Sequence, residues 1–121
     1  MDKKTQNETK MLSNIIIKAL QDKKAQDIVR IDVREKTILA DYFIICNGTN
    51  TTQVRAICEN AEEQVEKNGF ATLRREGERE GRWAVVDFGG VILHVFNAES
   101  REFYRIERLW GDESNIEKIE E

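Results

Sequence analysis

Hydrophobic positions change from a helical period to a strand period along the first part of the chain. From about residue 8 to residue 24, apolar residues recur every three or four positions, which predicts an amphipathic helix. Val29, Ile31 and Val33 then alternate with charged residues, so this segment is expected to be an edge or half-exposed strand with its charges on one face. Residues 42–46 are apolar at every position, which predicts a strand covered on both sides near the middle of a sheet.

The remaining pattern predicts a second helix, three more strands and a short final helix. Turn-forming residues over 47–51 end the central strand, and Asn50 or Thr51 is expected to cap the helix that follows. Asn68-Gly69 supplies the stop signal of that helix. The further elements are expected over residues 70–74, 82–88 and 91–97 as strands and 99–110 as a helix or turn. The central strand, the second helix and the first of these strands are expected to form a right-handed parallel crossover.

This order of elements predicts an α/β fold with a mixed five-stranded sheet flanked by helices. The chain has 121 residues and no proline, linker or repeat, so a single domain is expected. Its net charge of -4 is concentrated at one end, because residues 111–121 carry five acidic side chains and one lysine. We therefore expect one domain over residues 1–112 and an acidic C-terminal tail over residues 113–121.

Composition also argues against several functional classes. The neutral body lacks the basic footprint of a nucleic-acid clamp, so no direct nucleic-acid partner is expected. No apolar stretch is long enough to span a membrane and no hydrophobic signal segment follows the N-terminus, which favours a cytoplasmic protein. Cys46 and Cys58 have no companion Cys or His at ligand spacing, so buried, reduced thiols are expected in place of a disulfide or zinc site.

Residues 83–96 form the most informative segment, because Gly89-Gly90 divides them into the two arms of a predicted hairpin. A two-residue turn fixes which residues are opposite each other, and opposed residues share a face of the sheet. One face is entirely apolar and is assigned to the core: Ala84, Val86, Phe88, Val91, Leu93 and Val95. The other face mixes aromatic and polar residues: Trp83, Val85, Asp87, Ile92, His94 and Phe96.

This second face has two interpretations. Aromatic anchors combined with a few polar groups are typical of a protein–protein contact, which favours a docking surface. Alternatively, a terminal helix covers the face, and His94 and Asp87 bond to each other or to nearby backbone. Patterning alone leaves both interpretations open.

The sequence argues against catalysis. His94 is the only histidine and has no nucleophile motif nearby, which favours a packed or hydrogen-bonded role. The loop at residues 47–50 offers backbone N–H groups to a phosphate, yet it lacks the lysine of a P-loop and the glycine spacing of a dinucleotide site. Asp32 and Asp87 each stand alone on their strands, so no pair of carboxylates is available for two metal ions. No catalytic residue, cofactor or metal site is expected.

Three motifs stand in order along the chain at consistent separations. They are Ala40 to Thr49, then Glu80 to Trp83 with Asp87 to Gly89, then His94 to Phe96 with Arg101 to Asp112. With these motifs, the chain resembles the ribosomal silencing factors of the Iojap family from about Met11 to Asp112. It departs from the family at Asn47 and Asn50, where serine is common, and both changes preserve turn and capping chemistry.

The resemblance implies a nucleotidyltransferase-like fold that has lost its catalytic carboxylates. It also implies a translational repressor that binds the large ribosomal subunit through its fourteenth protein and sterically blocks joining with the small subunit. A role in large-subunit assembly and a homodimeric free state are implied as well. Carried over residue by residue, the implied contacts with the ribosomal protein are Trp83, Asp87 and His94, followed by Tyr104, Arg105 and Trp110.

Physical roles can be assigned to these residues. Trp83 is expected to be the buried anchor, Asp87 to accept from a basic group and His94 to orient the polar contacts. Trp110 also fits a helical stripe of core residues, which is its alternative role. Two other functions stay open at this stage: a minimal nucleotide-binding enzyme that uses the Gly48-Thr49 loop, and a homodimeric assembly adaptor whose docking face serves self-association.

Overall fold

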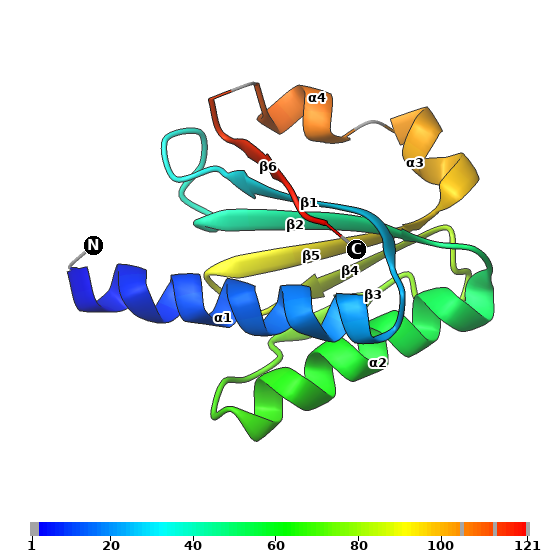
Figure 1. The fold of residues 1–121 in the computed structure, drawn as a ribbon, viewed down its shortest axis with the longest axis horizontal. Helices are drawn as coiled ribbons and strands as arrows, with labels where there is room; N and C mark the ends of the chain where they lie inside the picture. Colours follow the sequence, from blue (N-terminus) through cyan, green and yellow to red (C-terminus); the bar gives the residue numbers. More distant parts are fainter. Residues whose placement is uncertain (1–2, 105, 113, 121) are drawn as a thin grey trace.

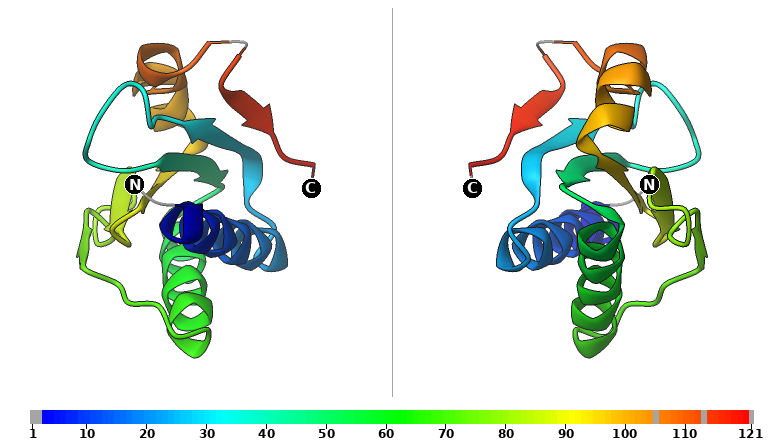
Figure 2. Two further views of the ribbon diagram at one scale, coloured as in Figure 1. Left: turned by 90° about the vertical axis from the view of Figure 1, so that its left-hand side faces the viewer. Right: turned by 90° about the vertical axis from the view of Figure 1, so that its right-hand side faces the viewer.

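The computed structural model describes residues 3–104, 106–112 and 114–120, which form one sheet covered by helices (Figure 1). The helices are α1 (Lys3–Asp22), α2 (Thr51–Lys67), α3 (Ala98–Tyr104) and α4 (Ile106–Trp110). The strands are β1 (Gln26–Asp32), β2 (Tyr42–Gly48), β3 (Arg74–Glu76), β4 (Trp83–Asp87), β5 (Val91–Asn97) and β6 (Ile116–Lys118). Helices α1 and α2 lie on one face of the sheet, and α3 and α4 lie on the other (Figure 1 and Figure 2). The predicted α/β class is confirmed.

The sheet has six strands in the order β3-β4-β5-β2-β1-β6, which corrects the predicted count of five. Strands β2 and β5 pair in parallel and all other neighbours pair antiparallel, so the sheet is mixed as predicted. The additional strand, β6, lies within the segment expected to be an acidic tail. Counting charges did not reveal this strand, because among the described residues of the segment only Ile116 and Ile119 pack against the core. The division into a domain over 1–112 and a tail over 113–121 stays a prediction.

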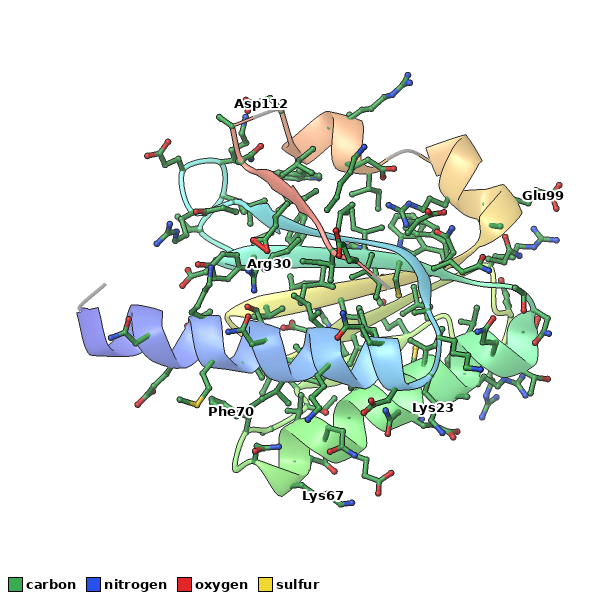
Figure 3. The ribbon with its side chains drawn as sticks, viewed as in Figure 1. Lys23, Arg30, Lys67, Phe70, Glu99 and Asp112 are labelled. Carbon is green, nitrogen blue, oxygen red and sulfur yellow. The ribbon has the colours of Figure 1, made fainter. Side chains whose placement is uncertain are left out.

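Strand β1 is interior, because β2 pairs with one of its edges and β6 with the other. The expectation of an edge or half-exposed strand was therefore wrong. Its charged residue Arg30 is only 7% exposed, because its guanidinium donates hydrogen bonds to acceptors on α1 and on β6. Nη1 donates to Ser13 Oγ at 3.0 Å and to Asn14 Oδ1 at 2.6 Å on α1. Nη2 donates to the two carboxylate oxygens of Glu117 on β6, at 2.8 and 2.9 Å (Figure 3).

The second helix begins and ends where the turn chemistry predicted. Asn50 is the N-cap, and its Oδ1 accepts from the Gln53 backbone N–H at 2.8 Å. Gln53 Oε1 in turn accepts from the Thr49 backbone N–H at 2.5 Å. At the other end, Gly69 follows the C-cap Asn68 with a φ of +86°, a left-handed conformation that favours glycine.

The crossover that leaves β2 is longer than predicted. The short strand expected over residues 70–74 is β3, shifted to Arg74–Glu76, and it pairs with β4 at the edge of the sheet. Strand β3 runs in the same direction as β2, but β4 and β5 separate the two. The parallel neighbour of β2 is β5, which is reached only after the chain has formed β3 and β4.

The predicted hairpin register is confirmed along β4 and β5, from Trp83 opposite Phe96 to Asp87 opposite Ile92. All six residues of the predicted core face belong to the cluster between the sheet and α1 and α2. The final helix or turn expected over 99–110 corresponds to helices α3 and α4, on either side of residue 105, which lies outside the described residues. Helix α4 carries Ile106 and Trp110 onto the second core cluster, on the opposite face of the sheet.

Both cysteines are free and buried in the first core cluster, as expected. Burial raises the pKa of the Cys58 thiol to about 12 and raises the pKa of Cys46 as well, so both thiols stay protonated and unreactive. Within the described residues, no helix combines the length and the apolar character needed to cross a membrane.

Removal of residues 113–121 is expected to destabilise the protein. The deletion strips β6 from β1 and leaves the buried Arg30 guanidinium without its carboxylate partner. We expect the free energy of unfolding to fall by about 2 kcal/mol or more, measured by urea denaturation. Glu117→Gln is the matched control, because it removes the charge and keeps the strand, and it should cost less. Unchanged stability of the truncated chain would show that β6 contributes nothing to the fold.

Candidate functional site

Aromatic rings form a continuous row across the face of the sheet that α3 and α4 only partly cover. Trp83 on β4 stacks on Phe96 of β5, with ring centroids 5.3 Å apart. His94, also on β5, meets the edge of Phe43 on β2 at 5.2 Å. Phe43 in turn contacts Trp110 of α4 at 5.2 Å in a T-shaped pair. The row therefore links three strands and the last helix, and it includes three of the predicted site residues.

A hydrogen bond orients the only histidine within this row. Trp83 Nε1–H donates to His94 Nδ1 at 3.1 Å, so Nδ1 is an acceptor and the proton of the neutral ring lies on Nε2. His94 is 8% exposed, and burial lowers the pKa of its imidazole from 6.5 to about 4. Nε2 is itself buried and has no hydrogen-bond partner among the described residues. The neutral ring therefore holds one unused donor beside Trp83.

The carboxylate of Asp87 lies on the same face but does not pair with His94. It accepts from the Gly89 backbone N–H at 2.8 Å, and Arg74 Nη2 lies 4.0 Å away. The register places Asp87 opposite Ile92 and places His94 opposite Val85. The alternative in which the two polar groups satisfy each other is therefore wrong for the described residues, although the Gly89 contact matches its other form, a bond to nearby backbone.

The face is covered unevenly. Phe96 and His94 are buried, whereas four of its residues are partly exposed: Trp83, Val85, Asp87 and Ile92. Trp110 is also partly exposed and packs against the second core cluster. Helix α3 contacts β5 and β2, and Trp110 of α4 packs on Phe43 of β2, whereas the residues of β4 on this face remain partly accessible to solvent.

Two of the predicted site residues cannot be placed in this way. Tyr104 ends α3, but its side chain lies outside the described part of the chain. Arg105 lies outside the described residues altogether.

The loop after β2 is occupied by its own capping bonds. The backbone N–H groups of Thr49 and Gln53 both donate to side chains of the cap. A Cβ on Gly48 would lie 3.1 Å from Val54, so the turn is closely packed on α2. These contacts leave fewer free donors for a phosphate than the sequence offered.

The two strand carboxylates are also far apart. Asp32 lies on β1 and shares a face with Arg30, whereas Asp87 lies on β4 and on the opposite face. Two strands separate β1 from β4, which corresponds to roughly 14 Å at normal strand spacing. Two catalytic metal ions lie about 4 Å apart, so these carboxylates do not form such a site. Among the described residues, no group of three His, Cys, Asp or Glu side chains is placed to bind a metal.

A second polar cluster escaped the sequence analysis. Arg101 of α3 is 9% exposed and approaches Glu107 of α4, with Nε and Oε1 3.4 Å apart. On one continuous helix, residues six positions apart lie on different sides, so the predicted single helix gave no reason to pair them. Their position inside the third motif was the only signal available.

Comparison with known proteins identifies the family. A family model described as ribosomal silencing factor during starvation matches residues 5–121. The chain belongs to the ribosomal silencing factor family. Members of this family are regulators of translation, not enzymes, and the expectation of a non-enzyme is confirmed by this membership.

Relatives in several organisms support the assignment to the ribosomal silencing factor family. The ribosomal silencing factor of Bacillus subtilis is 41% identical over 103 residues, which cover 85% of this chain and 87% of the relative. The chloroplastic Iojap protein of Zea mays is 30% identical over 84% of this chain, and the match spans 44% of that longer protein. A crystal structure of protein CV0518 from Chromobacterium violaceum is 32% identical with a TM-score of 0.83, covering 86% of this chain and 88% of that one. The resemblance first indicated by the three motifs is therefore confirmed.

The buried His94 predicts a stability that depends on pH. The unfolded chain protonates this histidine near pH 6.5, whereas the folded protein resists protonation down to about pH 4. The contribution of neutral His94 to the free energy of unfolding is therefore fully present above pH 6.5. It is lost as the pH falls from 6.5 to 4, by on the order of 3 kcal/mol in all. His94→Gln keeps an acceptor for Trp83 and cannot titrate, so its unfolding free energy should fall less between about pH 7 and pH 5. If the unfolding free energies of the two proteins changed in parallel with pH, His94 would not be the group whose burial causes the pH dependence.

Two glycines with similar backbone conformations are expected to differ in how much stability their substitution costs. A Cβ on Gly77, where φ is +84°, would lie 2.1 Å from the carbonyl oxygen of Trp83. Gly69 has a similar φ of +86° with nothing within 4 Å of a Cβ. Gly69→Ala should cost about 1 kcal/mol of unfolding free energy, through backbone strain alone. Gly77→Ala should cost at least about 2 kcal/mol, because the clash adds to the strain. If thermal or urea denaturation gave equal losses of unfolding free energy for the two variants, the loop around Gly77 would be able to move and relieve the clash.

Proposed function

We propose that this protein represses translation by binding the large ribosomal subunit through its fourteenth protein and sterically blocking joining with the small subunit. Family membership supports ribosome silencing as the function. A mouse relative, 29% identical over 100 residues, is named mitochondrial assembly of ribosomal large subunit protein 1, which supports the large subunit as the target and a further role in its assembly. Contact through the fourteenth protein and steric blocking of subunit joining go beyond what the names of the family and the mouse relative say, and they are part of our proposal.

The partly exposed indole of Trp83 is the observation that carries the choice of docking site. Its polar edge is held by His94 and its ring stacks on Phe96, so little side-chain freedom remains to be lost on binding. Trp is among the residues that contribute most to binding when a partner covers them. Trp83 is therefore suited to be the anchor of the contact.

The neighbouring polar groups give the contact its chemistry. A partner that covers Trp83 and supplies a carbonyl or carboxylate oxygen to His94 Nε2–H would satisfy the donor that the free protein leaves unpaired. Asp87, partly exposed on the same face, would accept from a basic group of the ribosomal protein. The neutral body of the chain lacks the basic footprint that ribosomal RNA would require, because RNA affinity depends on phosphate neutralisation, and this favours a ribosomal protein as the contact.

Tyr104, Arg105 and Trp110 are proposed as the outer part of the same site. Trp110 joins the aromatic row through Phe43 and is partly exposed, so it can serve the core and the contact together. We also propose that the fold is nucleotidyltransferase-like without its catalytic carboxylates, that the protein acts in the cytoplasm and that the free protein is a homodimer. The wide separation of Asp32 and Asp87 supports the loss of the metal site.

Trp83→Ala is expected to weaken binding to isolated large subunits by on the order of 2 kcal/mol, or about 30-fold. Co-sedimentation with large subunits measures this affinity, and a subunit-joining assay measures the loss of inhibition. Phe70→Ala is a matched control, because Phe70 is a partly buried aromatic residue that packs against the other core cluster, beyond the end of α2 (Figure 3).

Unimpaired binding by a folded Trp83→Ala protein would remove this residue from the site. If the unaltered protein left subunit joining unaffected at saturating concentration, the repressor function itself would be refuted. Sedimentation of free Trp83→Ala protein would further show whether the same face supports a homodimer.

A further inference from the structure

Helix α4 carries Trp110 at its last position, and a helix of this length depends on other parts of the chain to hold it in place. It has five residues, little more than one turn, and isolated helices this short are not stable in water. The carbonyl groups at its end have no partners within the helix. The Gly111 backbone N–H donates to the Glu107 carbonyl at 3.0 Å, whereas the Trp110 carbonyl is bound by a residue further along the chain.

That residue is Asn115, in the turn that leads into β6. Its Nδ2 donates to the Trp110 carbonyl oxygen at 3.1 Å and to the carbonyl oxygen of Asp32, the last residue of β1, at 2.9 Å. Its Oδ1 accepts from the Asp112 backbone N–H at 2.6 Å. Carbonyl oxygens only accept and an N–H only donates, so one orientation of the amide satisfies all three bonds. A single side chain therefore joins the end of α4 to the end of β1.

The backbone around Asn115 holds its side chain in this position. The Asp32 backbone N–H donates to the Asn115 carbonyl at 3.0 Å, directly beside the pairing of β1 with β6. Ile116 follows on β6 and packs against the same core cluster as Trp110. A Cβ on Gly111 would lie 2.4 Å from the Ile116 side chain, so the chain returns to β1 in a turn that has no room for a side chain there. Asn115 is therefore preorganised before any partner binds.

The ring of Trp110 is the part of the proposed docking site that this arrangement controls. It meets Phe43 at 5.2 Å in the aromatic row and stays partly exposed. Asn115 itself lies outside that row, because β6 is at the opposite edge of the sheet, four strand positions from the β4 strand of Trp83. An effect of Asn115 on docking is therefore expected to pass through Trp110.

We propose that Asn115 is a positioning residue for ribosome binding, which holds the carbonyl end of α4 against β1 so that Trp110 is presented to the partner. The inference rests on the proposed function, because it requires Trp110 to contact the ribosomal protein. A loosely held Trp110 would lose conformational freedom on binding, and this loss weakens a complex. With Asn115 in place, the ring is ordered in advance.

Asn115→Asp is the test, because it keeps the size of the side chain and the acceptor for Asp112. It replaces both donors by a carboxylate oxygen that faces the carbonyl groups of Trp110 and Asp32. Affinity for isolated large subunits, measured by co-sedimentation, should fall about fivefold or more. Ser114→Ala is the matched control in the same turn, because Ser114 donates to the Asp112 carboxylate and, among the described residues, to neither α4 nor β1. It should bind as the unaltered protein does.

The chain has two tryptophans, Trp83 and Trp110, and their indole N–H signals in NMR spectra report the position of each ring. Trp110→Phe assigns the two signals. In Asn115→Asp the Trp110 signal should move, whereas the Trp83 signal should not, because its bond to His94 is untouched. An unchanged Trp110 signal in the folded variant would show that Asn115 does not position the ring, and the proposal would be wrong.

A double-mutant cycle separates positioning from general destabilisation. If Asn115 acts through Trp110, Asn115→Asp should weaken binding much less in a Trp110→Ala chain than in the unaltered chain. Equal losses of affinity in the two chains would overturn the proposal, because the effect would then not pass through Trp110. Undiminished binding by a folded Asn115→Asp protein would overturn it as well.

The unaltered protein decides the matter if Asn115→Asp fails to fold. Both protons on Asn115 Nδ2 are hydrogen-bonded, so they should exchange with solvent more slowly than those of Asn50, whose exposed amide has only a 3.5 Å contact with Thr49. Equal exchange rates would contradict the bonds to Trp110 and Asp32.

The same experiments distinguish this inference from the proposed function. If the unaltered protein did not bind large subunits, the proposed function would be refuted, and the positioning role in binding with it. If the unaltered protein and Asn115→Asp bound equally well, only the inference about Asn115 would fail.

Discussion

Strand β5 has to satisfy two hydrophobic cores at once, and the rest of the structure follows from that constraint. It pairs in parallel with β2 along its whole length and antiparallel with β4 on its other edge. One set of alternating side chains, Val91, Leu93 and Val95, faces α1 and α2. The other set, Ile92, His94 and Phe96, faces the layer of α3 and α4. A shift of one residue would place His94 in the first core, so the register is strongly specified.

The polar member of the second set explains why that face differs from ordinary core. A histidine in the middle of a buried strand needs a partner, and the fixed register brings Trp83 to within hydrogen-bonding distance of one nitrogen. Burial keeps the ring neutral, and neutrality in turn allows Nδ1 to accept from the indole. The same pairing holds Trp83 at the boundary between core and solvent. A core requirement therefore orients the residue proposed to contact the ribosome.

Local patterns predicted those parts of the fold that depend on neighbours in sequence. The Gly89-Gly90 turn determined the hairpin register, and Asn50 with Gln53 determined the start of α2, because both signals act over a few residues. Strand β6 was missed because three residues with one apolar side chain show no period. It pairs with β1 and supplies Glu117 to Arg30, whose need for a carboxylate appears only when α1 and β1 are packed together.

In the candidate site as well, features set by local sequence pattern were predicted and features set by tertiary packing were not. Trp83, Asp87 and His94 were placed on one face by alternation alone, and the structure confirms that placement. The hydrogen bond from Trp83 to His94 was not predicted, since alternation gives a face but not a rotamer. The contacts of Arg101 with Glu107 and Asn47 could not be predicted at all, because no local pattern relates residues 101 and 107 to the end of β2.

The position of the acidic residues now matters more than their sum. The sheet order places β6 at the edge opposite to β3, so Glu117 on β6 lies at the far side of the sheet from Trp83 on β4. Glu117 is used to neutralise Arg30. Its charge is thus structural and local. It does not act on a partner at the proposed docking face, because four strand spacings, roughly 19 Å, separate β6 from β4 and exceed the screening length at physiological salt.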